Sequence, residues 1–464
     1  CSYDSDMSET AAEKLCSFIG GVSREKYYAI RNGILYHQVF GECDVDSRKE
    51  LSLRKNGVYV ITGGIGGIAL TIADFFSKKE RVKIVLLTRR EFIAPENWNN
   101  AINDSTLEEK VREKLCDLIE IRKNALSVET ISCDVADYDK LCGVLERIRK
   151  KYGNIDGIIH SAGVSHDVKI TDRENPELYR DIIEPKVKGT VNLHKATLYD
   201  NLQLFVMCSS IATVFSALGQ TDYIIANTFL DEFAWYRKTL GLPALTVNWC
   251  TWKEKGMAHD AGFTIDTIFK AMNCNEAIKG FNNALRTDYP RIHVGYFNEK
   301  GGMRLLQKSN IEVFGRLKKR LESFFEGSKN SESVYSQSSN TGDVMLAGRV
   351  DGDYTDTERR IGEVFSEVLE ITEIDIYDNF FEIGMDSISG IKIAQKLSEK
   401  IGRELNVVDI LRNNCINEYA KFLDTMNIEA EKTVSSEKTT LIVPEKRYQL
   451  SASQRGIFLL DKVG

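Results

Sequence analysis

Short apolar runs alternate with longer amphipathic stretches between residues 57 and 298. Turn residues bound each run, and the stretches between the runs carry apolar residues at helical spacing. This alternation predicts a doubly wound α/β domain, in which helices cover both faces of a parallel sheet. The predicted strands are Gly57–Ile61, Lys83–Leu87, Glu129–Cys133, Gly157–His160, Leu204–Cys208 and Ala244–Asn248.

The pattern differs on the N-terminal side of this region. Lys26–Arg31 and Ile34–Phe40 predict two strands joined by a turn at Asn32-Gly33. Residues 1–50 are too few for a domain of their own. We therefore interpret them as the end of a unit that begins upstream.

On the C-terminal side, the Ser-, Asn- and Gly-rich residues 327–343 predict a flexible linker, and a helical unit follows at 355–424. A second polar stretch then leads to an apolar segment that stops abruptly, so we expect a chain cut at both ends. The expected units are the tail of an upstream subdomain (1–50), the α/β domain (51–310), a linker (311–353), a helical domain (354–425), a second linker (426–446) and the start of a further domain (447–464).

The composition is that of a globular protein. A chain of 464 residues predicts two or more domains, and 42% hydrophobic and 28% charged residues are ordinary values. No run approaches the roughly 18 apolar residues that span a bilayer. The acidic, polar N-terminus is unlike a secretory signal. We therefore expect a cytoplasmic protein that does not enter a membrane.

Cysteines and charge narrow the possible functions. The ten cysteines are scattered singly, with no Cys-x-x-Cys pair, so we expect no metal site and no disulfide framework, and most cysteines as small core residues in a reducing cytosol. The net charge of −7 argues against nucleic-acid binding. Residues 355–424 hold 15 acidic and 8 basic residues, which leaves the remainder near neutral. Such a surface can steer encounters with several protein partners.

A glycine-rich loop follows the first predicted strand and runs into a helix. Glycines let the backbone turn sharply and approach a pyrophosphate, and the helix N-terminus offers free N–H groups and a favourable dipole. A strand before the loop and a helix after it are the context that a dinucleotide site requires. The candidate residues are Thr62, Gly63, Gly64, Ile65, Gly66 and Gly67, and Ala69 replaces a final glycine.

Later strand ends complete the predicted cofactor site. About 20 residues after the loop, an acidic residue would select NAD, whereas Arg89, helped by Arg90, suits the 2′-phosphate of NADP. A solvated basic strand end is the alternative interpretation. The third strand ends in a carboxylate that can accept from the adenine amine, and the fourth leaves space for the nicotinamide ribose. The remaining candidates are Thr88, Asp134, Val135, Ser161, Ala162 and Gly163.

Four further residues fit the reduction of a ketone. Tyr223 and Asn227 share one face of the predicted helix Thr221–Arg237, Ser210 ends a strand, and we place Lys186 at the end of an earlier helix. A tyrosine hydroxyl, whose pKa of about 10 a nearby ammonium lowers, can supply the proton. A serine can hold the carbonyl oxygen, and an asparagine can order a water for proton return. Each residue alone also fits an ordinary structural role, but together they predict a reductase.

Residues 57–260 resemble the short-chain dehydrogenase/reductase superfamily, and specifically the ketoreductase domains of modular polyketide synthases. In ordinary superfamily members the lysine follows the tyrosine by four residues, but here that position is Asn227 and the lysine is Lys186. That exchange is characteristic of the synthase type. The resemblance implies a Rossmann-like fold and NADPH, with Tyr223 as proton donor, Ser210 as carbonyl ligand, and Lys186 and Asn227 as the supporting pair. It rests on ITGGIGGIA, LLTRR, CDVAD, IDGIIHSAGV, EPKVKGTVNLH, FVMCSSIATVFSALGQTDYIIANTFLDEFAWYRK and GLPALTVNWCTWKEKGM.

The helical unit contains Asp378–Ile388, which leads into an amphipathic helix. By pattern alone, Ser387 would be an N-cap. The segment resembles the signature of acyl and peptidyl carrier domains, small all-α four-helix units, although Met385 departs from the more usual Gly or Leu. The resemblance implies 4′-phosphopantetheine on Ser387, attached by a phosphopantetheinyl transferase. The expected apolar face of the helix is Ile388, Ile391, Ile393, Ala394 and Leu397.

The last residues, from Tyr448 to Arg455, resemble the opening of a nonribosomal peptide condensation domain. We therefore expect a fragment of a hybrid synthase, in which NADPH reduces a carrier-bound 3-ketoacyl thioester. A depsipeptide synthetase module that reduces a 2-ketoacyl thioester is the nearest alternative, and a non-catalytic scaffold is a remote one. An upstream ketosynthase would favour the first, and an upstream adenylation domain the second.

Two positions bear on the configuration of the product. In the polyketide family, an Asp in the loop after the fourth strand accompanies D products, and a Trp eight residues before the tyrosine accompanies L products. This loop carries Asp167, the last member of the family's Leu-Asp-Asp triplet, and the second position is Phe215. We therefore expect a D hydroxyl group.

Overall fold

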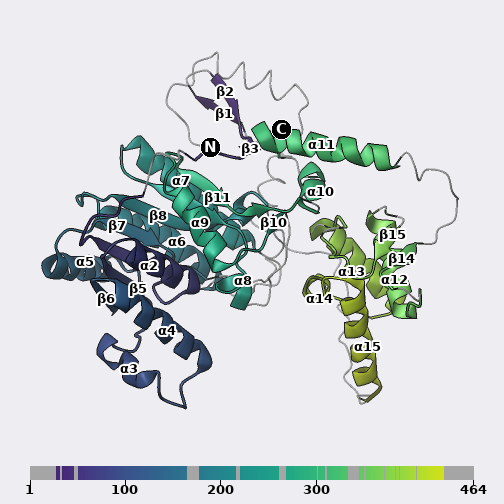
Figure 1. Ribbon diagram of the computed structural model, residues 1–464, viewed down its shortest axis with the longest axis horizontal. Helices are drawn as coiled ribbons and strands as arrows, with labels where there is room; N and C mark the ends of the chain where they lie inside the picture. Colours follow the sequence, from purple (N-terminus) through teal and green to yellow (C-terminus); the bar gives the residue numbers. More distant parts are fainter. Residues whose placement is uncertain are drawn as a thin grey trace, which may run out of the picture. The chain divides into compact units, whose positions relative to one another are not determined.

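A seven-stranded parallel sheet organises the α/β region within the part of the chain that the structure describes (Figure 1). The computed structural model describes residues 28–31, 34–45, 51–164, 177–215, 220–260, 268–299, 301–308, 311–332, 344–349, 352–369, 371, 373–381, 383–385, 387–403 and 405–432. The sheet strands are β4 (Val58–Thr62), β5 (Lys83–Thr88), β6 (Ser127–Ser132), β7 (Gly157–His160), β8 (Leu204–Ser210), β9 (Leu245–Trp249) and β11 (Arg291–Val294).

The strand order is β11-β9-β8-β7-β4-β5-β6, so the chain winds outward from β4 in one direction and then from β7 in the other. This confirms the doubly wound fold, and it places a topological switch point between β4 and β7, where ligands bind in such sheets. Six of the strands coincide closely with the predicted runs. The sequence did not predict β11, because this edge strand alternates buried and half-buried residues and lacks the continuous apolar run of a central strand.

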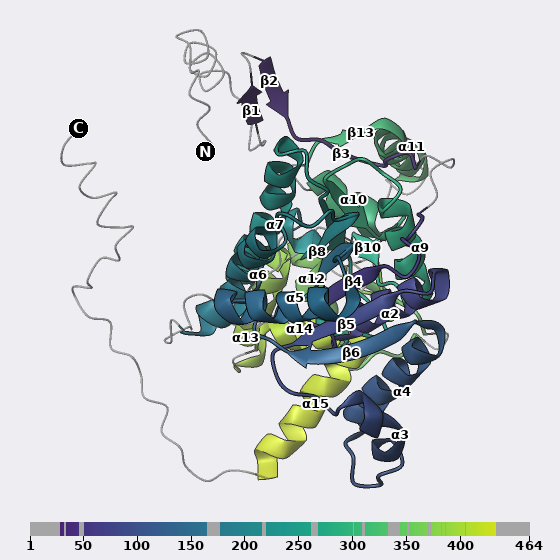
Figure 2. The same ribbon diagram turned by 90° about the vertical axis from the view of Figure 1, so that its left-hand side faces the viewer.

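Two hydrophobic cores lie on opposite faces of the sheet, because successive side chains of each strand point to opposite sides. Alternate residues of β4 belong to different cores: Tyr59 and Ile61 to one, Val58 and Val60 to the other. The first core contains α2 (Gly67–Lys79), α4 (Glu109–Asn124) and α9 (Cys274–Ala284). The second contains α5 (Tyr138–Tyr152), α6 (Glu177–Ala196) and α7 (Thr221–Thr239). Helices α6 and α7 lie side by side (Figure 2).

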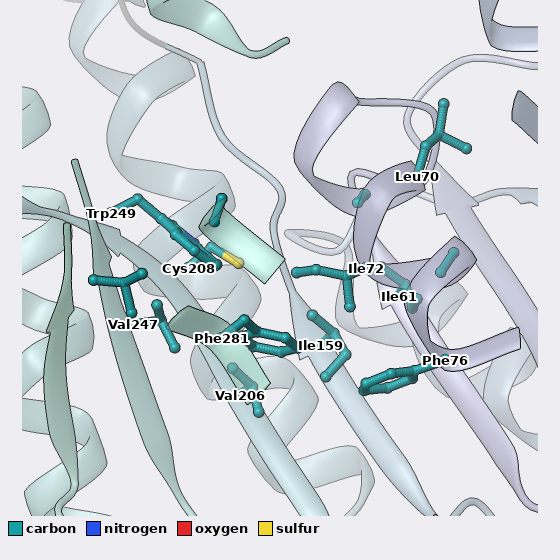
Figure 3. Packing of buried hydrophobic residues seen from close by; sticks show 14 of the residues in the cluster. Ile61, Leu70, Ile72, Phe76, Ile159, Val206, Cys208, Val247, Trp249 and Phe281 are labelled. Carbon is teal, nitrogen blue, oxygen red and sulfur yellow. The ribbon is translucent and has the colours of Figure 1, made fainter. Parts of the chain in front are cut away.

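Figure 3 shows part of the first core, where side chains from neighbouring strands meet those of the covering helices. Fully burying an aliphatic or aromatic side chain of this size contributes roughly 1.5–3 kcal/mol. The labelled residues are Ile61, Leu70, Ile72, Phe76, Ile159, Val206, Cys208, Val247, Trp249 and Phe281.

Strands β1 (Tyr28–Arg31) and β2 (Ile34–His37) pair antiparallel, with Arg31 opposite Ile34, as the predicted hairpin requires. The short strand β3 (Phe40–Gly41) pairs in parallel with β13 (Val313–Phe314), so an N-terminal segment meets one more than 250 residues later. The smaller elements are η1 (Pro95–Asn97), α3 (Trp98–Ala101), η3 (Ile211–Thr213), α8 (Met257–Asp260), the antiparallel pair β10 (Phe269–Lys270) and β12 (Tyr296–Phe297), and α10 (Gly301–Lys308).

The range 311–353 is not a continuous linker. It holds β13, α11 (Gly315–Glu332) and β14 (Met345–Ala347). Helix α11 forms because Leu317 is buried against Met303 and Leu306, with Leu321 and Phe324 packed on the same cluster. The many charged residues around this sparse apolar stripe hid it in the sequence.

The C-terminal helices are α12 (Asp356–Leu369), α13 (Ser387–Ile401), α14 (Val407–Arg412) and α15 (Ile416–Lys432), as a four-helix unit predicts. A parallel pair of β14 and β15 (Glu373–Asp375) adds to them. The rings of Phe365 and Phe380 stack at 4.1 Å. Of the predicted apolar face of α13, Ile393, Ala394 and Leu397 are buried, whereas Ile391 is 43% exposed.

The chain divides into two compact units, Cys1–Tyr419 and Ala420–Gly464. In the second unit the structure describes residues 420–432, which continue helix α15. Across the described helices, none combines the length and the apolar character that a membrane crossing needs.

Candidate active site

The glycine-rich loop lies at the switch point of the sheet. Gly63 follows β4 with a φ of +68°, and a Cβ atom there would lie 2.8 Å from the carbonyl oxygen of Ser161 in the loop after β7. Glycine is therefore required both by the backbone conformation and by the close approach of the two loops. The N–H of Gly64 donates to the carbonyl of Leu87 at 2.9 Å, which joins the loop to β5.

Helix α2 begins directly after this loop with Gly66 as its N-cap. A glycine has no side-chain oxygen to accept from the first N–H groups of the helix, so these groups remain available for an anion. Thr62 closes the opposite side of the loop: its Oγ1 is 2.7 Å from Nδ1 of His160 and accepts from the N–H of Ala162 at 3.2 Å. The arrangement suits a pyrophosphate.

The other predicted cofactor residues lie at the carboxyl ends of their strands. Thr88 donates through Oγ1 to the carbonyl of Arg90 at 2.6 Å, which shapes the turn after β5. Arg89 and Arg90 are exposed, and a guanidinium nitrogen of Arg89 lies 4.0 Å from a carboxylate oxygen of Asp181. Asp134 accepts from the N–H of Ala136 at 2.9 Å. Val135 is buried, and its carbonyl accepts from Nδ2 of Asn192 at 3.0 Å.

Lys186 lies in the middle of α6, not at the end of a helix as we expected. Pro185 indicated a helix end, because proline lacks an N–H and disfavours the helix interior. The helix continues through it, with Ile182 and Leu193 buried on either side. Tertiary burial therefore outweighs the local signal.

The ammonium of Lys186 is positioned inside the protein. The side chain is 3% exposed, and Nζ donates to the carbonyl of Cys208 on β8 at 2.9 Å. Burial lowers the pKa of Lys186 to about 8, which still leaves most of the group charged at pH 7. A Cβ on Gly163 would lie 2.8 Å from Cε of Lys186, so the glycine after β7 gives the lysine its space.

Tyr223 and Asn227 lie on α7 beside this ammonium. Nζ of Lys186 is 5.9 Å from the centroid of the Tyr223 ring. Nδ2 of Asn227 donates to the carbonyl of Tyr223 at 2.7 Å, and the buried Oδ1 of Asn227 has no hydrogen-bond partner among the residues that the structure describes. A buried amide oxygen in this state can accept a hydrogen bond from a donor such as a water or a substrate group.

Ser210 ends β8, two residues after the carbonyl that holds Lys186. It is the N-cap of η3, and its hydroxyl accepts from the N–H of Ala212 at 3.2 Å. The structure thus gathers the four predicted catalytic residues around the carboxyl end of β8, next to the loop after β7 that the glycines approach. A carbonyl compound placed there would meet a serine hydroxyl, a tyrosine and a buried ammonium.

In the helical unit, α13 begins at Ser387. Several hydrogen bonds hold the turn before it: for example, Asn379 Oδ1 accepts from the N–H of Phe381 at 2.9 Å, and the N–H of Met385 donates to the carbonyl of Phe380 at 2.9 Å. Gly384 has a φ of +103°, which favours glycine at this turn. The local backbone therefore places residue 387 at a helix start.

Comparison with known families agrees with this geometry. Residues 57–254 match the KR domain family, and residues 359–423 match the phosphopantetheine attachment site family. The chain joins a ketoreductase domain to a carrier domain, as polyketide synthases do.

Two curated relatives illustrate the match. The chain is 26% identical over 412 residues to polyketide synthase PksN of Bacillus subtilis (strain 168), and 27% identical over 358 residues to mellein synthase of Phaeosphaeria nodorum (strain SN15 / ATCC MYA-4574 / FGSC 10173). These alignments cover 86% and 75% of the chain but only 7% and 19% of the relatives. A solved A1-type ketoreductase shares the fold, with a TM-score of 0.58, 23% identity, and coverage of 68% of this chain and 64% of that one.

Of the two residues predicted to control the configuration of the product, the structure describes only Phe215. Asp167 lies outside the described residues. Phe215 follows η3 and packs edge-on against Phe40 of β3 and Phe269 of β10, with ring centroids 5.6 and 6.0 Å away. The aromatic cluster therefore connects the N-terminal segment to the residues that follow Ser210.

The ketoreductase holds two buried polar residues, Asp231 and Asn248, that the sequence pattern did not indicate. Asp231 lies four residues after Asn227 on α7 and is 0% exposed, and Asn248 lies in β9. An acid at helical spacing from a candidate catalytic residue, among apolar neighbours, was a signal that could have identified the first.

Proposed function

We propose that the ketoreductase reduces a 3-ketoacyl thioester to a 3-hydroxyacyl thioester, with NADPH as the reductant and the acyl chain carried on phosphopantetheine at Ser387. The observation that carries this proposal is the placement of Lys186, Ser210 and Tyr223 around one strand end, beside a glycine loop that suits a pyrophosphate. Relatives named polyketide synthases support the 3-keto substrate, because chain extension in that class produces a ketone at that carbon.

The cofactor site supports a dinucleotide. The close approach at Gly63 and the uncapped start of α2 would hold the pyrophosphate, and Arg89 with Arg90 would hold a 2′-phosphate. Asp134 would accept from the adenine amine. When bound, NADPH supplies the hydride that reduces the carbonyl carbon.

Side chains of the protein bind and protonate the carbonyl oxygen of the substrate. The hydroxyl of Ser210 donates a hydrogen bond to the carbonyl oxygen, which orients it and stabilises the charge that develops there. Tyr223 donates its phenolic proton to that oxygen as the hydride arrives at carbon, and the product is an alcohol. The buried ammonium of Lys186 favours the phenolate that remains. The buried Oδ1 of Asn227, which has no partner among the described residues, can order the water that returns a proton to the tyrosine.

The carrier delivers the substrate. A phosphopantetheinyl transferase would attach the arm to the hydroxyl of Ser387 through a phosphodiester, and the thioester at the end of the arm would then reach the ketoreductase. An upstream ketosynthase would supply the ketoacyl group, and a downstream condensation domain would accept the hydroxyacyl group. The acidic excess of residues 355–424 suits repeated docking on such domains.

The configuration of the product is D in this proposal, for which Asp167 and Phe215 are the supporting positions. Neighbouring loops select the side from which the thioester enters, and the entry side determines which carbonyl face meets the hydride. A competing transition state only about 2.7 kcal/mol higher gives a 100-fold preference.

Tyr223→Phe tests the proposal directly, because it removes the proton and keeps the ring. NADPH oxidation with a small 3-ketoacyl thioester should fall at least about 100-fold, the scale of general acid catalysis. Binding of NADPH, followed by fluorescence, should be retained. Tyr236→Phe, an exposed position on the same helix, is the matched control and should keep full activity.

Near-normal turnover in Tyr223→Phe would exclude this tyrosine as the acid. A 2-ketoacyl thioester run in parallel tests the substrate class. Faster reduction of the 2-keto compound would replace the 3-ketoacyl proposal with the depsipeptide one.

A further inference from the structure

A buried polar network lies behind the catalytic residues, between α7, β8 and β9. Asn248 Nδ2 lies 3.1 and 2.9 Å from the two carboxylate oxygens of Asp231. The same nitrogen is 3.1 Å from the carbonyl of Ser210 and 2.9 Å from Oγ1 of Thr213. Asp231, Asn248 and the catalytic strand end are therefore joined through one amide group.

The hydrogen bonds of this network have a consistent direction. Thr213 Oγ1 donates to the carbonyl of Ser210 at 3.1 Å, so this hydroxyl can accept from Asn248. Ser209 Oγ donates to the carbonyl of Asn227 at 3.3 Å and lies 3.2 Å from Asn248 Nδ2. The two hydrogens of the amide then serve the carboxylate on one side and the strand end on the other.

The orientation of the Asn248 amide is determined by Asp231. The buried Oδ1 of Asn248 has no hydrogen-bond partner among the described residues, which is an unfavourable state for an amide oxygen. A carboxylate accepts only, so it requires the NH₂ group to face it. The charge-assisted bond compensates for the unpaired oxygen.

Asp231 also acts on the catalytic lysine through charge. Its carboxylate raises the pKa of Lys186 and so opposes the larger effect of burial. As a thiolate, Cys208 raises the pKa of Lys186 as well, and more than Asp231 does. Burial keeps Cys208 on β8 protonated and lowers the pKa of His160 on β7 to about 3, and Tyr223 on α7 is the proposed acid.

We propose that Asp231 is a positioning residue of the ketoreductase: through Asn248 it holds the carbonyl of Ser210, and its charge supports the ammonium of Lys186. This inference rests on the proposed function. Arg291 of β11 is a cationic partner of this carboxylate, since one of its guanidinium nitrogens lies 3.7 Å from Asp231. Burial raises the pKa of Asp231, and the hydrogen bond from Asn248 and, to a smaller extent, the charge of Arg291 oppose that rise.

Asp231→Asn removes the charge and keeps the shape. In the whole chain, with NADPH and a small ketoacyl thioester, we expect kcat to fall about tenfold while KM stays within about twofold, the pattern of a loss confined to the transition state. Loss of the charge lowers the pKa of Lys186 further, so the alkaline limb of the kcat/KM profile should move to lower pH.

Thr246→Val is the matched control. Thr246 is a buried residue of β9 whose hydroxyl donates to the carbonyl of Leu230 on α7 at 3.0 Å. The substitution removes a hydrogen bond from the same helix–strand interface without touching Ser210. It should lower the melting temperature and leave kcat and the pH profile unchanged.

Arg291→Gln is the second variant, and it decides the question if Asp231→Asn does not fold. Without the guanidinium the pKa of Asp231 rises, so the carboxylate loses its charge at higher pH and the acid limb of the profile should move upward. The inference would be overturned if Asp231→Asn had the same kcat and the same pH profile of kcat/KM as the control Thr246→Val. It would also be overturned if the acid limb of that profile did not shift in Arg291→Gln. An unmodified chain that fails to reduce the thioester would instead refute the proposed function.

Discussion

The ketoreductase and the carrier build their proposed reactive sites in different ways. In the ketoreductase, Lys186 comes from α6, Ser210 from the end of β8, and Tyr223 and Asn227 from α7, and Lys186 and Asn227 are buried. In the carrier, the predicted attachment residue begins α13 directly after a turn made by its sequence neighbours.

The difference shows how chemistry relates to burial. A proton donor and an ammonium have to be held at set distances in a low dielectric, so distant elements must converge. A serine that is to be modified by another enzyme needs access and a short defined backbone. We therefore expect substitutions at several distant positions of the ketoreductase to change its reaction rate. In the carrier, we expect only substitutions at or next to the attachment residue to prevent modification.

Ser387→Ala should have the largest effect, because it removes the hydroxyl oxygen to which we propose that the arm is bonded. Treatment with coenzyme A and a phosphopantetheinyl transferase should produce no mass gain in this variant. Reduction of a small free ketoacyl thioester should be unchanged, since that substrate needs no arm. Ser389→Ala, two residues later on α13, is the control and should still gain the mass of the arm. If Ser387→Ala lost both the mass gain and the reduction of the free thioester, the two sites would depend on each other, and the contrast drawn between them would be wrong.

Arg89→Asp should affect cofactor selection within the ketoreductase. The substitution replaces a partner of the 2′-phosphate with a residue that suits a ribose 2′-hydroxyl, so binding of NADPH should weaken at least about tenfold more than binding of NADH. Titration with each cofactor measures this ratio. Arg81→Asp, at the opposite end of β5, is the charge-matched control. Equal use of NADH and NADPH by the unmodified chain would contradict the assignment.

The pH dependence of kcat/KM should report the titration of the buried Lys186. Lys186 is protonated below its pKa of about 8, so kcat/KM should be level between the acid limb and that value and fall about tenfold per unit above it. Initial rates at saturating NADPH across a pH series measure the limb. Retention of the same limb in Lys186→Met would show that another group titrates.

Phe215→Trp should have the smallest effect, and it tests whether a residue next to the proposed active site changes the configuration of the product without changing turnover. The larger ring changes the packing against Phe40 and Phe269, so the excess of D over L product should fall a few-fold while turnover is retained. Chiral chromatography of the released hydroxy acid gives the ratio, and Phe40→Leu tests whether the cluster itself carries the effect. A predominantly L product from the unmodified chain and a 3-ketoacyl substrate would refute the D assignment.

Much of the molecule was determined by local sequence. The continuous apolar runs of β4, β5, β7, β8 and β9 identified these strands, because a strand buried on both faces has no polar positions to obscure it. The glycines after β4 and the segment before α13 were identified in the same way, since each conformation depends on residues adjacent in the chain. Resemblance to known families then indicated the four residues that we propose for catalysis.

Only the tertiary structure decided the features that depend on partners distant in sequence. Helix α6 continues through Pro185, and α11 forms in a stretch that resembled a linker, because buried contacts outweigh the local propensity. The links from Asp231 through Asn248 to Ser210 join three elements, and no spacing along the chain encodes them. Local pattern specifies which backbone forms, whereas burial against distant residues determines where a helix ends, which side chains meet and which charges persist.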